Sequence, residues 1–277
     1  MKSFPFFKLS PSGNTTLLIP EPEIDEKNKQ TIAKTVLLPT HLQAEQVGFI
    51  DIEKAHLAMA GGEFCVNATR AFGALLAEAH SQGAIAAHAP FSAFVTVSGM
   101  AEPVRIIVSG CRPFWQVDAE LELACLPPCL PVGQGMVLVR LSGIDHLLLD
   151  ESTQPMPQNW QEAAATLRRE HHLEESEAAG CIWWRQTDHG VSMKPVVWVR
   201  ACNSTFLESA CGSGALACTL GLPFLRKAAQ EQPIALLQPS QDILTLRLRK
   251  NAHSWQARVG GLVALVAQGQ CYMQKDF

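Results

Sequence analysis

Two cysteines of this sequence stand in settings that suit acid–base chemistry. Cys65 lies in GGEFCVNATRAF, residues 61 to 72, and Cys211 lies in ESACGSGALAC, residues 208 to 218. Each cysteine comes just before a run whose apolar residues have helical spacing, so each is expected at a helix N-terminus. A thiol there faces the positive end of the helix dipole and unpaired backbone N–H groups. We therefore expect both thiols to have lowered pKa values and to act as bases near neutral pH.

Two such helices facing each other would place two sulfurs on opposite sides of one carbon. One thiolate would remove an α-proton while the other thiol returned a proton on the opposite face, which inverts the centre. The small neighbours Gly212, Ser213 and Gly214, like Asn67 and Ala68, would let a carboxylate approach the helix N–H groups. Those donors would stabilise the charge that develops as the proton leaves, and pyridoxal would be unnecessary. From spacing alone, two buried structural cysteines at helix starts stay an open alternative.

The two stretches also resemble each other. Aligning Cys65 with Cys211 places Asn67 on Ser213 and Ala71 on Ala217, and the offset is a little over half of the 277 residues. Two pseudo-repeated halves would give such an offset.

Composition restricts the partners of the chain. The formal net charge is −4, and no cluster of Lys and Arg stands out, so a nucleic-acid partner is not expected. No apolar run approaches the ~20 residues of a membrane span, and the N-terminal apolar patch is too short for a secretory signal. These features predict a cytoplasmic protein with a small-molecule partner and no membrane contact.

The nine cysteines are odd in number and irregular in spacing, which favours reduced thiols over a disulfide scaffold. Cys125 and Cys129 alone have a metal-like spacing, and a zinc site needs a second ligand pair. We therefore expect no metal site.

Strand-like segments dominate the chain, and three helical patterns interrupt them. One helix is expected after Cys65, stopping near Gly83, and another after Cys211, running to about Ala229 with an interruption at Pro223. A third covers NWQEAAATLRREHHL, and the acidic stretch PEPEIDEKNKQ is expected to be a solvated loop. Many strands with few helices predict an α+β fold.

These motifs resemble the diaminopimelate epimerase family of cofactor-independent amino-acid racemases over nearly the whole chain. ACGSGALAC is similar to the family's second-cysteine motif and FCVNATRAF to its first. KLSPSGNTT resembles the N-terminal loop whose Asn contacts substrate, and GIDH resembles the loop that places a His beside the active site. Within the family, the sequence looks most like the histidine-racemase branch associated with opine metallophore synthesis.

The resemblance implies roles for individual residues. Cys65 and Cys211 would be the acid–base pair, and no cofactor would be needed. His146 would support the site from nearby, and Glu208 would lie near the substrate's α-amino group. The remaining substrate-binding positions are Asn14, Asn67 and the backbone amides around Val66, Gly212 and Ser213. Without the resemblance, Asn14 reads as a turn residue, His146 as a buried histidine and Glu208 as a helix-start carboxylate. The role of Glu63 stays open.

Three departures from the epimerase bear on the substrate. Val66 replaces the Gly that follows the first cysteine, and Ile144 in GIDH stands where the family has a substrate-binding Asn. The Arg that recognises the distal end of diaminopimelate has no counterpart before Cys211, where VRACNSTFLES stands instead, and the direction of Arg200 is unknown. Asn203, Ser204, Thr205 and Phe206 suit a shorter, planar side chain, so the resemblance favours conversion of L-histidine to D-histidine.

The resemblance implies an α+β fold of two pseudo-symmetric halves, each a curled sheet around a central helix. Residues 1–114 would form the first half and 115–262 the second, with a strand at about 263–277 returning to the first. Diaminopimelate epimerase and a proline racemase-like enzyme stay as alternatives, as do a phenazine-biosynthesis-type isomerase and a non-catalytic amino-acid or metal binding protein. The sequence leaves open whether the chain is a homodimer.

Overall fold

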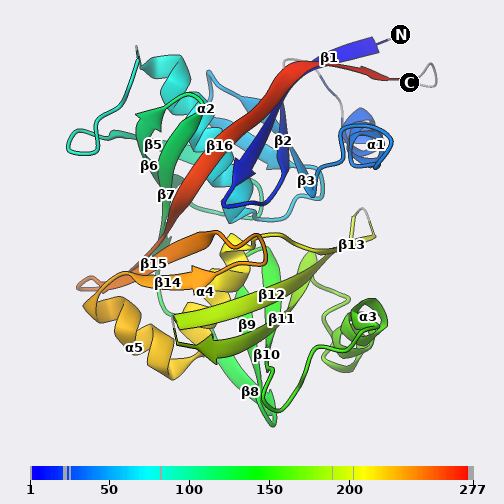
Figure 1. Cartoon of the computed structure of the whole chain (residues 1–277), viewed down its shortest axis with the longest axis vertical. Helices are drawn as coiled ribbons and strands as arrows, with labels where there is room; N and C mark the ends of the chain where they lie inside the picture. Colours follow the sequence, from blue (N-terminus) through cyan, green and yellow to red (C-terminus); the bar gives the residue numbers. More distant parts are fainter. Residues whose placement is uncertain are drawn as a thin grey trace.

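The computed structural model describes residues 2–20, 24, 26–81, 83–188, 190–201 and 203–273. The fold is α+β, as predicted, with a barrel-like sheet and few helices (Figure 1). No helix in these ranges is long and apolar enough to cross a membrane.

The first part of the sheet surrounds one helix. Strands β1 to β7 pair in chain order, and β16 (Trp255–Met273) pairs with both β7 and β1, which closes the ring. Helix α2 contacts every strand of this ring and is buried from Val66 to Ala77. The elements are β1 (Lys2–Pro11), β2 (Thr16–Pro20), α1 (Glu26–Val36), β3 (Gln46–Asp51), β4 (His56–Met59), α2 (Val66–His80), β5 (Phe91–Val97), β6 (Val104–Cys111) and β7 (Phe114–Leu123).

The second part of the sheet runs from β16 through β15, β14, β12, β11, β10 and β9 to β8, and β13 pairs with β12. Helix α4 packs against β9, β10, β15 and β16, and all its residues are buried. The elements are β8 (Cys129–Gly133), β9 (Met136–Leu141), β10 (Ile144–Asp150), α3 (Trp160–Glu170), β11 (Ala178–Thr187), β12 (Gly190–Val199), β13 (Ser204–Leu207), α4 (Gly212–Gly221), α5 (Pro223–Glu231), β14 (Ile234–Leu237) and β15 (Ile243–Lys250).

Strand β16 belongs to both parts of the sheet. Its first residues pair with β15 and β7, and its last residues pair with β1, from Pro11 opposite Val263 to Lys2 opposite Met273 (Figure 1). Residues 274–277 of the segment expected to return to the first half lie outside the described residues.

Helix α1 was not predicted. Part of the stretch expected to be a solvated loop instead forms α1 from residue 26 onward. The helix buries Ile32, Ala33 and Val36 in an apolar cluster with β2, β3 and the end of β16. Packing of this narrow apolar stripe outweighs the polar composition of the segment.

The expected break at Pro223 is confirmed. Helix α4 ends at Gly221, and Pro223 occupies the first turn of α5, where its missing N–H costs no intrahelical hydrogen bond.

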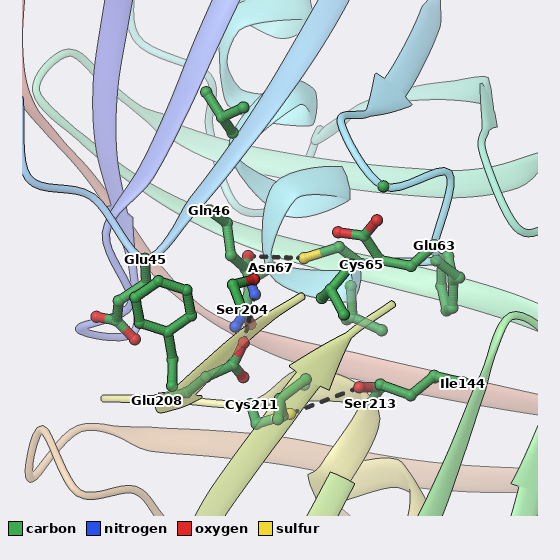
Figure 2. Close-up of a pocket in the computed structure, with 18 of the residues that line it drawn as sticks. Glu45, Gln46, Glu63, Cys65, Asn67, Ile144, Ser204, Glu208, Cys211 and Ser213 are labelled. Carbon is green, nitrogen blue, oxygen red and sulfur yellow. Dashed lines mark hydrogen bonds between the residues drawn. The ribbon is translucent and has the colours of Figure 1, made fainter. Parts of the chain in front are cut away.

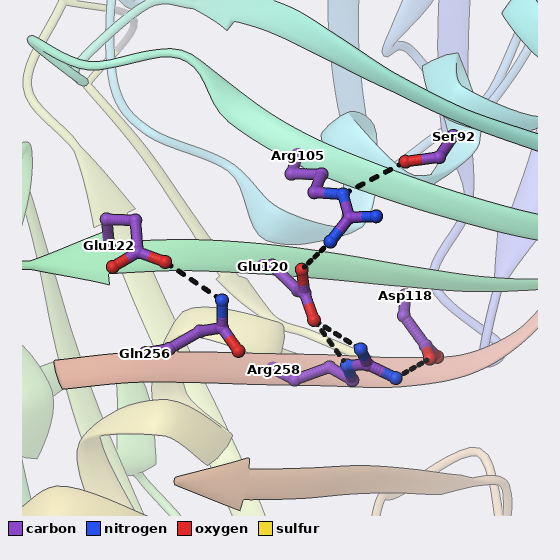
Figure 3. Close-up of polar contacts among 7 residues, drawn as sticks. All are labelled: Ser92, Arg105, Asp118, Glu120, Glu122, Gln256 and Arg258. Carbon is purple, nitrogen blue, oxygen red and sulfur yellow. Dashed lines mark hydrogen bonds and ion pairs between the residues drawn. The ribbon is translucent and has the colours of Figure 1, made fainter. Parts of the chain in front are cut away.

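A polar ladder links β6, β7 and β16 on the sheet (Figure 3). Glu120 on β7 is buried and pairs with Arg105 on β6 and with Arg258 on β16. Arg258 also lies 3.5 Å from Asp118. Because a buried carboxylate needs such partners, the ladder fixes the pairing of β7 with β16, where the two parts of the sheet join.

Candidate active site

Both cysteines begin helices, as predicted. Cys65 is the N-cap of α2 and Cys211 is the N-cap of α4, and both have extended backbone angles. Each Sγ accepts a hydrogen bond from the N–H three residues later, from Ala68 and Gly214, at 3.3 Å in both cases. The N–H groups of Val66, Gly212 and Ser213 stay available to a ligand, and that of Asn67 also interacts with the Cys65 sulfur.

The two helix N-termini meet at one cavity (Figure 2). A Cβ added to Gly212 would lie 2.7 Å from the side chain of Val66, so only glycine allows this approach. The wall of the cavity is formed by residues from both parts of the sheet: Leu37, Glu45, Gln46, Val47, Ala60, Gly61, Glu63, Phe64, Cys65, Val66, Asn67, Ile144, Val197, Val199, Ser204, Phe206, Glu208, Cys211, Gly212 and Ser213.

The expectation that the two thiols have lowered pKa values is wrong for this state of the site. Burial raises the pKa of Cys65 and of Cys211 well above the ordinary value, and the nearby charge of Glu208 raises both further. The backbone N–H groups at the helix starts oppose these effects but are weaker. Desolvation therefore outweighs the helix dipole, and both groups are thiols here.

Gln46 connects the first cysteine to Glu208. The Cys65 thiol donates to Gln46 Oε1 at 2.8 Å, and Gln46 Nε2 donates to Glu208 Oε1 at 2.6 Å (Figure 2). Burial raises the pKa of Glu208 to about 8, with a further contribution from the charge of Glu45. The protonation states of Cys65 and Glu208 are thus linked through one amide.

The second cysteine has different neighbours. Its Sγ lies 3.5 Å from Ser213 Oγ, and its backbone N–H donates to Gln238 Oε1 at 3.0 Å. Both contacts are buried.

Two asparagines hold the chain that leads into Cys211. Asn14 Nδ2 and Asn67 Nδ2 both donate to the carbonyl oxygen of Ala210, at 3.3 Å and 2.7 Å. Glu45 accepts hydrogen bonds from Asn14 and from the N–H of Ser209. Asn67 lines the cavity with its Oδ1 unpartnered, whereas Asn14 lies behind the wall.

His146 lies outside the cavity wall. It is fully buried on β10, and neither ring nitrogen has a hydrogen-bond partner. A Cβ on Gly180 of β11 would lie 2.2 Å from its Nδ1. Burial lowers the pKa of His146 to about 3, so the imidazole is neutral. The structure therefore brings together all the predicted site residues except Asn14 and His146.

The cavity wall contains no Lys, Arg or His among the described residues, although it contains three glutamates. Arg200, whose direction the sequence left open, is exposed and donates to the carbonyl oxygen of Glu175. Burial raises the pKa of Glu63 to about 7. The site thus offers anionic and neutral partners to a ligand side chain.

Sequence reasoning did not find Glu45 and Gln46. They lie at the start of β3, about twenty residues before Cys65, in a stretch without a motif. The parallel pairing of β3 with β2 brings them to the cavity, and that register is not readable from local sequence.

Comparison with known proteins adds to this geometry. A family model described as histidine racemase CntK N-terminal domain matches residues 3–272. A histidine racemase of Fusobacterium nucleatum subsp. nucleatum is 30% identical over 278 residues, covering 98% of this chain and 97% of that protein.

Two solved structures share the fold. A hydroxyproline epimerase from Agrobacterium vitis, with bound trans-4-hydroxy-L-proline, is 12% identical with a TM-score of 0.70, covering 99% of this chain and 94% of that one. A phenazine biosynthesis protein of the PhzF family from Enterococcus faecalis is 16% identical with a TM-score of 0.60, covering 98% and 100%.

Proposed function

The chain belongs to the histidine racemase family and is an amino-acid racemase, and from this premise we propose that it interconverts L- and D-histidine with Cys65 and Cys211. The observation that carries the two-base scheme is the placement of both thiols at helix N-caps on the wall of one cavity. One sulfur removes the α-proton and the other donates its proton to the opposite face of the carbanion.

The helix N-termini supply the carboxylate site. The N–H groups of Val66, Asn67, Gly212 and Ser213 are free of intrahelical acceptors because each is in the first turn of its helix. Two helices aimed at one carboxylate stabilise the negative charge that grows on it as the α-proton leaves.

Glu208 and Gln46 prepare the thiolate. The substrate's ammonium group beside Glu208 offsets the carboxylate charge that raises the pKa of both thiols. When Cys65 loses its proton, its sulfur needs a donor in place of an acceptor. Rotation of the Gln46 amide by half a turn directs Nε2 to the sulfur, and the substrate's ammonium group then replaces Nε2 as the donor to the Glu208 carboxylate. The proton of the Cys65 thiol is released to solvent as the ammonium group binds.

The composition of the cavity favours histidine over diaminopimelate. A distal carboxylate would meet only carboxylates and neutral groups on the described wall, and a buried charge without a partner costs several kcal/mol. Phe206 and Val199 offer apolar surface to a planar ring, and Ser204 offers a hydroxyl.

The test is α-proton exchange in D2O, followed by NMR, with circular dichroism to measure inversion. L-Histidine, LL-diaminopimelate, proline, glutamate and alanine are compared at equal concentration. We expect the fastest inversion with histidine, and we expect activity to survive EDTA and carbonyl reagents. Faster inversion of diaminopimelate or proline would replace the substrate, and zinc-dependent activity would exclude the two-thiol mechanism.

The two-halves architecture is also a proposal. Strands β1 to β7 pair in the order antiparallel, parallel, antiparallel, parallel, antiparallel, antiparallel. The series β9, β10, β11, β12, β14, β15 and β16 repeats that order, with α4 in the place of α2. This repetition supports two halves and extends the first through the end of β7 at Leu123, past the boundary expected at residue 114. A cytoplasmic location, a homodimer and a role in metallophore synthesis stay predictions.

A further inference from the structure

Of the three glutamates of the cavity, Glu208 serves the racemase chemistry and Glu45 is held by hydrogen bonds from Asn14 and Ser209, whereas Glu63 has neither role. It lies two residues before Cys65 and lines the same cavity, yet its Oε2 is buried without a hydrogen-bond partner (Figure 2). Glu208 also has one oxygen, Oε2, without a partner, but its Oε1 accepts from Gln46 and the proposed function already assigns it to the substrate's ammonium group. A buried acceptor without a donor is costly in a native protein, so its presence in a ligand cavity requires a reason.

The surroundings of Glu63 favour a donor from the ligand. Backbone N–H groups of residues 61 and 63 stabilise its charged form only in part, and burial still raises its pKa to about 7. No described Lys, Arg or His lines the cavity to compensate it. The apolar side chains of Val199 and Phe206, together with Ser204, line the same cavity.

We propose that Glu63 determines the substrate side chain by accepting the N–H of the histidine imidazole. Because this inference rests on the proposed function, it concerns the same site and adds the recognition of the ring. The α-ammonium meets Glu208 and the imidazole N–H meets Glu63, so the ligand supplies a donor to each carboxylate. An acidic side chain is repelled, and an apolar ring leaves Glu63 unpaired.

The experiment compares two ligands in two variants. L-Histidine and β-(2-thienyl)-L-alanine are similar in ring size, but only the imidazole carries an N–H. In wild type, kcat/KM for α-proton exchange should be about 100-fold higher with histidine. In Glu63→Gln, the value for histidine should fall about tenfold, because the neutral amide oxygen accepts the N–H more weakly than a carboxylate, and in Glu63→Leu, which has no acceptor, it should fall about 100-fold. The value for thienylalanine should stay within about threefold in both variants.

Glu177→Gln is the matched control. Glu177 is exposed, contributes to the electrostatic environment of Glu63 and does not line the cavity. Its variant should leave both rates within about twofold of wild type, because a solvent-exposed charge is strongly screened. A fall with Glu177→Gln as large as that with Glu63→Gln would assign the effect to general electrostatics and overturn the proposal.

Two further outcomes are decisive. Equal losses for both ligands in Glu63→Gln would mean that Glu63 supports the Cys65 loop and does not read the side chain. Isothermal calorimetry with the same two ligands measures the affinity ratio without turnover. A tenfold or larger preference for histidine that narrows in Glu63→Gln and disappears in Glu63→Leu supports the inference even if histidine is not the fastest substrate. The substrate screen with wild type tests the proposed function separately.

Discussion

The N-termini of α2 and α4 use the same local structure in unequal surroundings. In both, an extended cysteine caps the helix and accepts an N–H at 3.3 Å. Cys65 donates to Gln46 on β3, whereas Cys211 lies against the hydroxyl of Ser213. Val66 follows the first cysteine and Gly212 the second, and these two residues pack against each other.

The different surroundings of Cys65 and Cys211 show which features the two-base chemistry requires at both sulfurs. Both sulfurs need a helix N-terminus, since the cap fixes the sulfur and leaves N–H groups for the carboxylate. Both sulfurs are linked to Glu208, Cys65 through the Gln46 amide and Cys211 by a direct side-chain interaction. A racemase must bind both enantiomers, but its two sulfurs can have different neighbours as long as both face the same α-carbon of the substrate.

Replacing either cysteine should reduce the rate of racemisation more than any other change. Cys65→Ser and Cys211→Ser should each reduce racemisation at least about 10³-fold, because a serine hydroxyl is a far weaker acid than a thiol. Each variant keeps one thiol and should still exchange the α-proton of one enantiomer without inversion. The two variants should exchange opposite enantiomers, as NMR in D2O measures.

Cys111→Ser is the control for this pair, because Cys111 is exposed and lies away from the cavity. It should match wild type. Near-wild-type racemisation in Cys65→Ser or Cys211→Ser would exclude a two-base scheme.

Gln46 offers the next largest effect, directly on Cys65 and through Glu208 on Cys211. Gln46→Leu removes the acceptor of Cys65 and the donor to Glu208, so we expect kcat to fall about 10- to 100-fold. The pH profile of kcat/KM should also change, because Cys65 and Glu208 then titrate without the linking amide. Gln238 contacts the backbone N–H of Cys211 and not its sulfur, so the pH profile of Gln238→Leu should keep the wild-type shape. An unchanged profile in Gln46→Leu would make Gln46 a packing residue.

Local sequence was sufficient to predict the caps and insufficient to predict their environment. Helix periodicity after Cys65 and Cys211 reports on neighbouring residues, so the helix starts could be placed. The pKa direction was wrong because burial and the charge of Glu208 arise from tertiary packing. Helix α1 was missed for the same reason, since its buried apolar residues Ile32, Ala33 and Val36 gain stability only against distant strands.

Glu63 and Glu208 should also differ in how they change the free energy of unfolding with pH. A carboxyl whose folded pKa exceeds its unfolded pKa stabilises the protein below the unfolded value and loses that contribution as pH rises. For Glu63 the window runs from 4.5 to about 7, and for Glu208 from 4.5 to about 8. Glu63→Gln should therefore unfold like wild type at pH 4.5 and be more stable at pH 8.5, by up to roughly 3 kcal/mol.

Urea unfolding at both pH values measures this difference, with Glu177→Gln as the exposed control. Glu208→Gln should show a larger gain over a wider pH range. A Glu63→Gln protein that is less stable than wild type at pH 8.5 would show that the carboxylate is well paired in the folded state.

The smallest effect should come from the residues that hold the approach to each cysteine. Asn14 and Asn67 both donate to the carbonyl oxygen of Ala210. The carbonyl oxygen of Glu63 accepts from one side chain, Ser98 Oγ, at 3.0 Å. Asn14→Ala leaves Asn67 as a donor to Ala210 but also removes the bonds to Glu45 and Thr16. Ser98→Ala leaves the carbonyl of Glu63 and the N–H of Met59 without their side-chain partner. Since one neutral hydrogen bond contributes about 1 kcal/mol, each variant should cost about 2 kcal/mol, by urea unfolding. A loss in Asn14→Ala well below that in Ser98→Ala would mean that Asn67 alone secures the chain before Cys211.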